Sequence, residues 1–155
     1  MKKRTMLLIV AFCFSLAAAS FAADANVGAW KLNASKSNVP AGAARNDTVV
    51  YTAAGDSYKC VVDGVDAAGE PAHNEWTGKF DGKDYPVKGS YGYDQVSLKR
   101  VNNNSFEETD KLNGKVNEVD TWTVSKDGKN LTVVAVEKPS ERTNTYVATK
   151  VSEKK

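Results

Sequence analysis

The stretch SFEETDKLNGKVNEVDTWTVSKDGKNLTVVAVE, residues 105–137, holds two turn signals between runs in which apolar and polar side chains alternate. Asn113-Gly114 and Asp127-Gly128 are pairs that accept the positive φ angles of two-residue hairpin turns. The flanking runs are rich in Val and Thr, with Phe and Trp interspersed, and these residue types favour strands. The stretch therefore predicts consecutive antiparallel strands joined by hairpins.

The same pattern extends through residues 25–151. Asp63-Gly64 and Asp81-Gly82 are further turn pairs, and no window of ten or more residues has a helical apolar stripe. The predicted strands lie near 26–33, 47–53, 57–65, 72–80, 84–88, 95–101, 105–112, 116–125, 129–137 and 143–151. Most links are hairpin-length, and an open sheet would leave two bare edges. We predict an all-β fold, an up-and-down antiparallel β-barrel of about 8–10 strands, closed by pairing the first strand with the last.

Alternation assigns one face of each strand to the barrel interior. Trp30 and Leu32 share the inner face of the first strand, and Lys31 lies on the outer face. The inner faces of later strands carry Tyr58, Cys60 and Val62, then Trp76 and Phe80, Val96 and Leu98, and Trp122 and Val124.

The N-terminal segment has the layout of a secretory signal peptide. A basic patch at Lys2, Lys3 and Arg4 precedes an apolar run and the cleavage-site pattern Ser20-Phe21-Ala22. We predict a signal peptide over 1–22, a single domain over 23–155, and export to the periplasm or beyond the cell. The apolar run is too short for a comfortable transmembrane helix, and no second run follows.

Removal of residues 1–22 changes the charge balance of the chain. The full sequence has 21 basic and 19 acidic residues, and residues 1–22 contain three basic and no acidic ones, so the mature chain carries a formal −1. No basic stripe remains for a polyanion, and nucleic acid is therefore not an expected partner. Cys60 is the only cysteine left, so an intrachain disulfide is excluded, and we expect a buried thiol there.

Gly28-Ala29-Trp30 resembles the Gly-x-Trp signature of the lipocalin-like, or calycin, β-barrels. The segments GAWKLNASKS, FDGKDYPVKG and VSKDGKNLT are also similar to small exported bacterial proteins of that fold. The resemblance implies that Gly28 and Trp30 form a plug at the closed end and that an arginine packs over the tryptophan. Arg142 is the arginine nearest the last strand and is the candidate. The chain lacks the Thr-Asp-Tyr motif, the C-terminal helix and the disulfide of central lipocalins.

Residues 34–46 form a long link for a meander, and we expect them to cover the open end of the barrel as a lid. The interior aromatic and apolar side chains either line a ligand cavity or fill the barrel. We name as cavity-lining residues Tyr58, Trp76, Phe80, Leu98, Phe106, Trp122 and Tyr146.

Signals for catalysis or metal binding are poor. His73 is the only histidine, and we expect it to face solvent, so a Ser-His-Asp or Cys-His arrangement has little support. Zinc sites require several His or Cys ligands, and the spacing of a calcium-binding loop is absent. We predict no enzyme activity, no cofactor and no metal.

Two arrangements remain for the acidic residues around the Asn113-Gly114 turn. A three-residue link gives the facing pairs Phe106–Trp122, Glu108–Asp120 and Asp110–Glu118, with four carboxylates on the aromatic face. A two-residue link slips the pairing and scatters the acids. Because residues 107–111 are polar on both faces, we expect this part of the strand to project into water.

These observations lead to one hypothesis of function and two rivals. We expect an exported, monomeric, lipocalin-like barrel that binds a small apolar or amphipathic molecule without catalysis. The first rival is a solidly packed structural or interaction module of the cell envelope that acts through its surface. The second, which we do not favour, is an enzyme that uses carboxylate acid-base chemistry at Glu108 and Asp120.

Overall fold

The predicted all-β barrel is confirmed by a computed structural model that describes residues 24–89 and 92–151. The predicted signal peptide, 1–22, lies outside the described residues. Within the described residues ten strands follow one another, and a single 3-10 turn, η1, separates the first two. The elements are β1 (Gly28–Leu32), η1 (Ala34–Lys36), β2 (Arg45–Ala54), β3 (Ser57–Val65), β4 (Pro71–Gly78), β5 (Asp81–Gly89), β6 (Gln95–Asn102), β7 (Ser105–Leu112), β8 (Lys115–Val124), β9 (Asn130–Glu137) and β10 (Thr143–Lys150).

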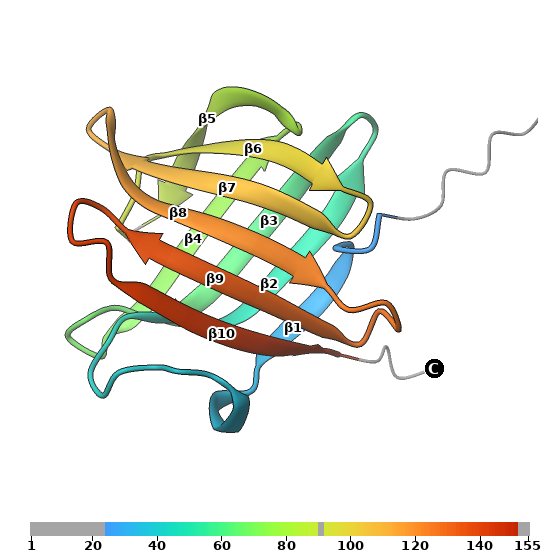
Figure 1. Ribbon diagram of the computed structural model, residues 1–155. Coiled ribbons are helices and arrows are strands. Elements are labelled where there is room, and N and C mark those ends of the chain that lie inside the picture. The colour runs from blue at the N-terminus through green and yellow to red at the C-terminus, as the bar shows by residue number, and fades with distance from the viewer. Residues whose placement is uncertain (1–23, 90–91, 152–155) are drawn as a thin grey trace, which may run out of the picture.

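The sheet closes between its first and last strands, as predicted. Each strand pairs antiparallel with its sequence neighbours, and β1 pairs with both β2 and β10. Trp30 lies opposite Val49 on one side and Lys150 on the other. Figure 1 shows the result: the β7–β8 and β9–β10 turns lie at one end of the barrel with the long link after β1, and the β8–β9 turn lies at the other.

Two of the four predicted turn pairs are turns, and two are not. Asn113-Gly114 and Asp127-Gly128 link strands, but Asp63-Gly64 lies inside β3 and Asp81-Gly82 lies at the irregular start of β5. A Cβ on Gly64 would stand 2.0 Å from the carbonyl oxygen of Arg45, where β2 bulges toward β3. The backbones of β2 and β3 therefore approach closely at Gly64 and leave no room for a side chain. Such close backbone approach is a common reason for glycine within a strand.

Trp30 packs in the closed half of the barrel, but its cationic neighbour is not Arg142. The Trp30 side chain is 0% exposed, and its indole N–H donates to the carbonyl oxygen of Asn26 at 2.8 Å. The Nζ atom of Lys150 lies 5.1 Å from the ring centroid, and its aliphatic chain occupies the space where Gly28 lacks a Cβ. Lys150, next to Gly28, thus packs over Trp30 in the position that the family resemblance assigned to Arg142.

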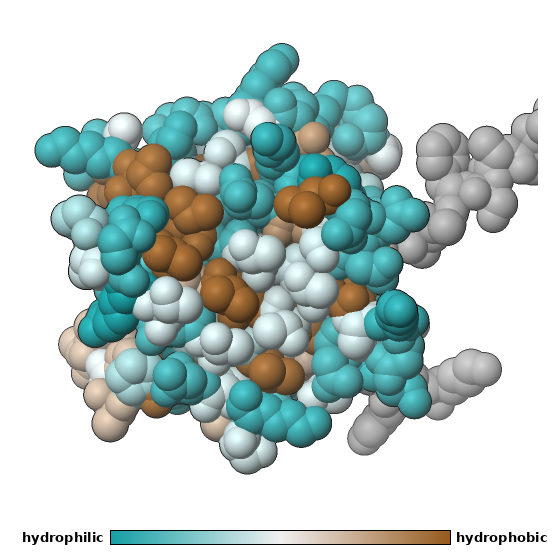
Figure 2. Space-filling view, viewed as in Figure 1, coloured by the Kyte–Doolittle hydropathy of each residue, from teal (hydrophilic) through white to brown (hydrophobic). Residues whose placement is uncertain are grey.

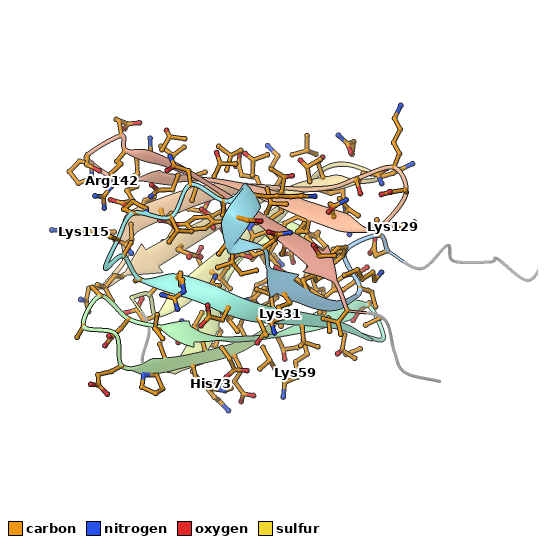
Figure 3. The ribbon with its side chains drawn as sticks, turned by 90° about the horizontal axis from the view of Figure 1, so that it is seen from below. Lys31, Lys59, His73, Lys115, Lys129 and Arg142 are labelled. Carbon is orange, nitrogen blue, oxygen red and sulfur yellow. The ribbon has the colours of Figure 1, made fainter. Side chains whose placement is uncertain are left out.

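Arg142 lies at the opposite end of the barrel, and its predicted contact with Trp30 is wrong. It precedes β10, eight residues before Lys150, which corresponds to about 26 Å along a strand. Its Nη2 atom pairs with Oε1 of Glu137 at 2.6 Å. Figure 3 shows Arg142 at one end of the molecule and Lys129 at the other. The sequence showed that Arg142 lies near the last strand. It did not show at which end of that strand, and so at which end of the barrel, Arg142 would lie.

The closed half is packed with aromatic side chains. The ring of Tyr51 meets those of Trp76, Phe106 and Trp122 edge-on at centroid distances of 5.7, 5.8 and 6.0 Å. At the closed end, the guanidinium of Arg100 lies 3.9 Å from the centroid of Phe80 and pairs with Asp24 at 2.8 Å. Such edge-on and cation-π contacts add to the burial of large apolar areas.

The outer face of β8–β10 is largely uncharged. Val119, Val134, Val136 and Val147 alternate with inward residues and are only partly buried. Figure 2 shows apolar and weakly polar side chains in the middle of this face, with hydrophilic ones around it. Among the described residues, no helix has the length and apolarity needed to cross a membrane.

Candidate functional site

A cavity of about 510 Å³ occupies the open half of the barrel. Residues Pro40 to Asn46, from the long link after β1 and the first residues of β2, form part of its wall. The link is held against the barrel by a bridge between Asn38 and Thr145 and by the Ser37 hydroxyl, which accepts from the backbone N–H of Val147 at 2.9 Å. The predicted lid therefore lies at the mouth of the cavity.

One part of the cavity wall is apolar and aromatic. Its aliphatic residues come from four strands and are Leu32, Val49, Leu131, Val133 and Ala148. Trp122, Tyr146 and Tyr93 add aromatic surface. This composition is that of sites that bury most of a small organic ligand.

Another part of the wall is acidic because of the register of the β7–β8 hairpin. Leu112 and Lys115 pair across a two-residue Asn113-Gly114 turn, in which both residues have positive φ. Asn117 is an extra residue on β8 that shifts the register, so that Glu108 faces Asp120 and Asp110 faces Glu118. A two-residue turn plus a bulge thus gives the pairing that we expected only from a three-residue link.

The expectation that these acids project into water was wrong. Glu108, Asp110 and Asp120 are only 4, 5 and 6% exposed, and one oxygen from each lies within 4.8 Å of the others. On β8 the usual polarity is inverted, because Glu118 and Asp120 point inward while Val119 and Thr121 point outward. We call Glu108, Asp110, Glu118 and Asp120 the acidic wall.

Burial raises the pKa of every carboxyl group in the acidic wall. It raises the pKa of Glu108 to about 8, against the opposing effect of a hydrogen bond from the Tyr51 hydroxyl at 3.2 Å. The pKa values of Asp110 and Asp120 are raised well above normal, first by burial and then by neighbouring carboxylates. That of Glu118, which is less buried, is raised for the same reason. These groups therefore retain protons at a pH where exposed carboxyls have lost them.

The acidic wall has no ion-pair partner among the described Lys and Arg residues. Oδ1 of Asp110, Oδ1 of Asp120 and the indole Nε1 of Trp122 are buried without a hydrogen-bond partner in the described chain. Buried polar atoms are nearly always paired, so these atoms are candidates for contact with a bound molecule. The oxygens of Glu108, Asp110 and Asp120 are also close enough together to ligate one hard metal ion.

Of the seven residues predicted to line a cavity, Trp122 and Tyr146 do so. Tyr58, Trp76, Phe80, Leu98 and Phe106 do not, because they belong to the packed closed half or its edge. Alternation indicates which side chains point inward but not how deep along the barrel they lie. The prediction from sequence missed Tyr93, which lines the cavity, and Tyr51, which donates a hydrogen bond to Glu108. Tyr51 shares strand parity with Val49 and was open to detection, whereas Tyr93 lies in a link that has no such periodicity.

The remaining candidates for chemistry, His73 and Cys60, do not line the cavity. His73 is on the outer face of β4, exposed, with Nδ1 2.7 Å from Oδ1 of Asp63, and Figure 3 shows it outside the barrel. Cys60 is buried, and burial raises the pKa of its thiol well above normal. Both predictions of environment are confirmed.

The comparisons with known proteins add no relative. No protein-family model matches the chain, and no curated protein matches it. The ten-stranded antiparallel barrel is compatible with the lipocalin-like resemblance of the Gly-x-Trp strand, and the fold is what the structure establishes.

Proposed function

We propose that the protein is an exported, monomeric, lipocalin-like binding protein that holds a small amphipathic molecule in the open-end cavity and does not transform it. The observation that carries the proposal is the cavity of about 510 Å³, which has an aliphatic and aromatic part and an acidic part in one enclosure. An amphipathic ligand matches both parts, whereas a purely apolar ligand would leave the buried carboxyl groups unpaired.

The division of the barrel into a filled and a hollow half favours binding over the rival of a solidly packed module. The closed half already supplies an aromatic core around Tyr51, Phe106 and Trp76. The interior side chains of the open half leave a space between them that side chains of ordinary size could have filled. The long link covers the mouth of this space and is held there by main-chain contacts to β10.

Binding also accounts for the acidic wall better than acid-base catalysis does. A catalytic carboxylate pair needs one group held protonated and one held ionised by different environments. Here burial moves the pKa values of Glu108, Asp110 and Asp120 in the same direction. Burial raises the pKa of Glu118 as well, although its hydrogen bond with Asp120 opposes the rise, so all four carboxyls are shifted toward the protonated form.

The test of binding uses a neutral fluorescent hydrophobic probe, N-phenyl-1-naphthylamine, and two tryptophan variants of adjacent residues on β10. Ala148 lines the cavity, and its neighbour Thr149 points outward. We expect wild-type protein and Thr149→Trp to bind the probe at one site and Ala148→Trp to lose binding while it retains its circular dichroism spectrum. Equal binding by all three proteins would contradict a site in the cavity.

Export is tested separately from binding. The signal peptide over 1–22 predicts a mature chain that begins at Ala23. Mass spectrometry of the protein recovered from the periplasm or medium of a producing cell should give the mass of residues 23–155. Recovery of the full-length chain from the cytoplasm alone would contradict export.

A further inference from the structure

We infer that the molecule held in the open-end cavity is an organic cation, with a protonated amine seated against Glu108, Asp110 and Asp120 and its apolar portion against the aliphatic and aromatic wall. This inference rests on the proposed function, because it specifies the ligand of the same cavity.

The first support is the geometry of the three carboxyl groups. Oxygens of Glu108, Asp110 and Asp120 lie within 4.8 Å of one another, a spacing that lets one nitrogen contact more than one of them. An alkylammonium group has three N–H donors and no acceptor, so it complements the oxygens of these carboxyl groups once they have released their protons. Oδ1 of Asp110 and Oδ1 of Asp120 have no hydrogen-bond partner in the described chain and supply two of those acceptors.

The second support is the charge balance of the site. Glu108, Asp110 and Asp120 are each more than nine-tenths buried, and no described Lys or Arg forms an ion pair with them. Among the described residues, three cations line the cavity, and each has its own acidic partner. Arg142 is engaged by Glu137 through contacts of 2.6 and 2.7 Å. Lys138 pairs with Glu141, and Arg45 pairs with Asp47. Buried charged groups are normally paired, so the site selects a ligand that brings positive charge with it.

The rest of the cavity favours an organic cation over a metal ion. An ion at the carboxyl groups would leave most of the 510 Å³ and its aliphatic lining without a role. Trp122, next to Asp120 on the inner face of β8, lines the cavity together with Tyr146 and Tyr93. Aromatic side chains attract ammonium groups through their ring faces and pack against the apolar part of the same molecule.

The protons on the acidic wall provide a signature of amine binding. The groups that face Glu108 are Tyr51, Cys60 and Tyr93, together with the other three carboxyls of the wall. A positive charge next to carboxyl groups that hold protons favours their ionised form. Binding of a protonated amine should therefore release protons to the buffer, and binding of a neutral molecule should not.

The experiment compares three probes with one eight-carbon chain and different head groups: n-octylamine, 1-octanol and octanoate. Isothermal titration calorimetry at pH 7.5, in two buffers of different ionisation enthalpy, gives both affinity and proton release. We expect octylamine to bind about tenfold or more tightly than octanol and octanoate to bind more weakly than either, with proton release for octylamine alone.

Two variants connect the preference to the carboxyl groups. The double substitution Glu108→Gln and Asp120→Asn keeps the side-chain shapes and removes two ionisable groups. We expect it to abolish the preference for octylamine over octanol and the proton release. Glu107→Gln is the matched control, because Glu107 neighbours Glu108 on β7 but is exposed on the outer face, and it should behave as wild type.

Each alternative outcome is decisive. Equal affinity for the three probes, or a preference for octanoate, would overturn the cationic ligand and leave the cavity-binding function standing. If no octyl probe displaces N-phenyl-1-naphthylamine and that neutral probe itself does not bind, both proposals fail. If Ca²⁺ or Mn²⁺ binds in equilibrium dialysis and octylamine neither binds nor competes, the acidic wall is a metal site and the organic cation is overturned.

Discussion

The hydroxyl of Tyr51 on β2 donates a hydrogen bond across the barrel to Oε2 of Glu108 on β7, at 3.2 Å. The two residues are 57 positions apart in the sequence. Their contact lies at the boundary between the filled and the hollow halves of the barrel. On its closed-end side the Tyr51 ring packs against three aromatic rings. Tyr51 is thus both a core residue and the support of one carboxyl of the acidic wall.

The stability of the protein without ligand should decrease as the pH rises from about 5 to 8. The pKa of Glu108 is about 8 in the folded protein against an ordinary 4.5, so between these values the folded state binds more protons than the unfolded state. Its favourable contribution is complete below the unfolded pKa and is lost as pH rises through the folded pKa, with a slope of up to about 1.4 kcal/mol per pH unit for each such proton. Asp110 and Asp120 act in the same direction. Urea denaturation at several pH values measures this, and a flat profile would contradict it.

The double variant Glu108→Gln and Asp120→Asn should be more stable than wild type at pH 8, by more than about 2 kcal/mol. The gain arises because two buried carboxyls no longer have to ionise without a cationic partner. At pH 5 the two proteins should differ less, because the wild-type groups are then protonated. Glu107→Gln should change the free energy of unfolding by less than about 0.5 kcal/mol at either pH. A loss of stability in the double variant at pH 8 would argue against a crowded buried cluster.

Tyr51→Phe should raise the pKa of Glu108 above about 8. The Tyr51 hydroxyl donates a hydrogen bond that favours the carboxylate, and its removal leaves burial unopposed by that donor. Infrared spectroscopy of the carboxylic C=O stretch as a function of pH reports the titration. Tyr58→Phe, at the closed end, is the control and should leave the titration unchanged. A lower Glu108 pKa in Tyr51→Phe would disprove the assigned role.

Trp30→Ala should destabilise the barrel by about 3–5 kcal/mol. The substitution removes a fully buried ring and its hydrogen bond to Asn26, and it leaves Lys150 without the ring beneath its ammonium group. Lys31→Ala changes the adjacent, exposed position of the same strand and should have little effect. Thermal and urea denaturation measure both, and similar stabilities for the two variants would show that Trp30 is not a core residue.

Gly64→Ala should cost more stability than Gly55→Ala, although only Gly55 has a positive φ. A Cβ at Gly64 would meet the Arg45 carbonyl oxygen at 2.0 Å, and backbone must move to accommodate it. At Gly55 the space is open, and the cost is the strain of φ +66°, about 1 kcal/mol. Urea denaturation of the two variants measures the difference, and the reverse order would show that the β2 bulge adapts easily.

Much of the fold was predictable because its determinants are local. Alternation over a few residues places a strand, and Asn113-Gly114 and Asp127-Gly128 accept turn angles that other residues resist. Closure of the barrel was predicted because an open sheet would leave two strand edges unpaired, which is unfavourable in any β-sheet. The pairing of Trp30's strand with the last strand was therefore correct without any knowledge of side-chain contacts.

The candidate site was not predictable in the same way. The solvated arrangement of Glu108 and Asp120 was the natural interpretation of a polar stretch, because a carboxyl group is normally stable only in water or beside a cation. One bulged residue, Asn117, restores the register that turns these groups inward. Whether an inward group is buried then depends on side chains from other strands and on the link across the mouth.

By itself, the sequence determined the class of fold, the approximate strand positions, the closure and the inner face of several strands, because these depend on neighbours within a few residues. Only the tertiary structure decided that the closed half is filled, that the open half is hollow, and that four carboxyl groups line the hollow part. The physical reason is that the depth of a side chain along a barrel and the dielectric around it are set by residues far away in the chain, such as Tyr51 for Glu108.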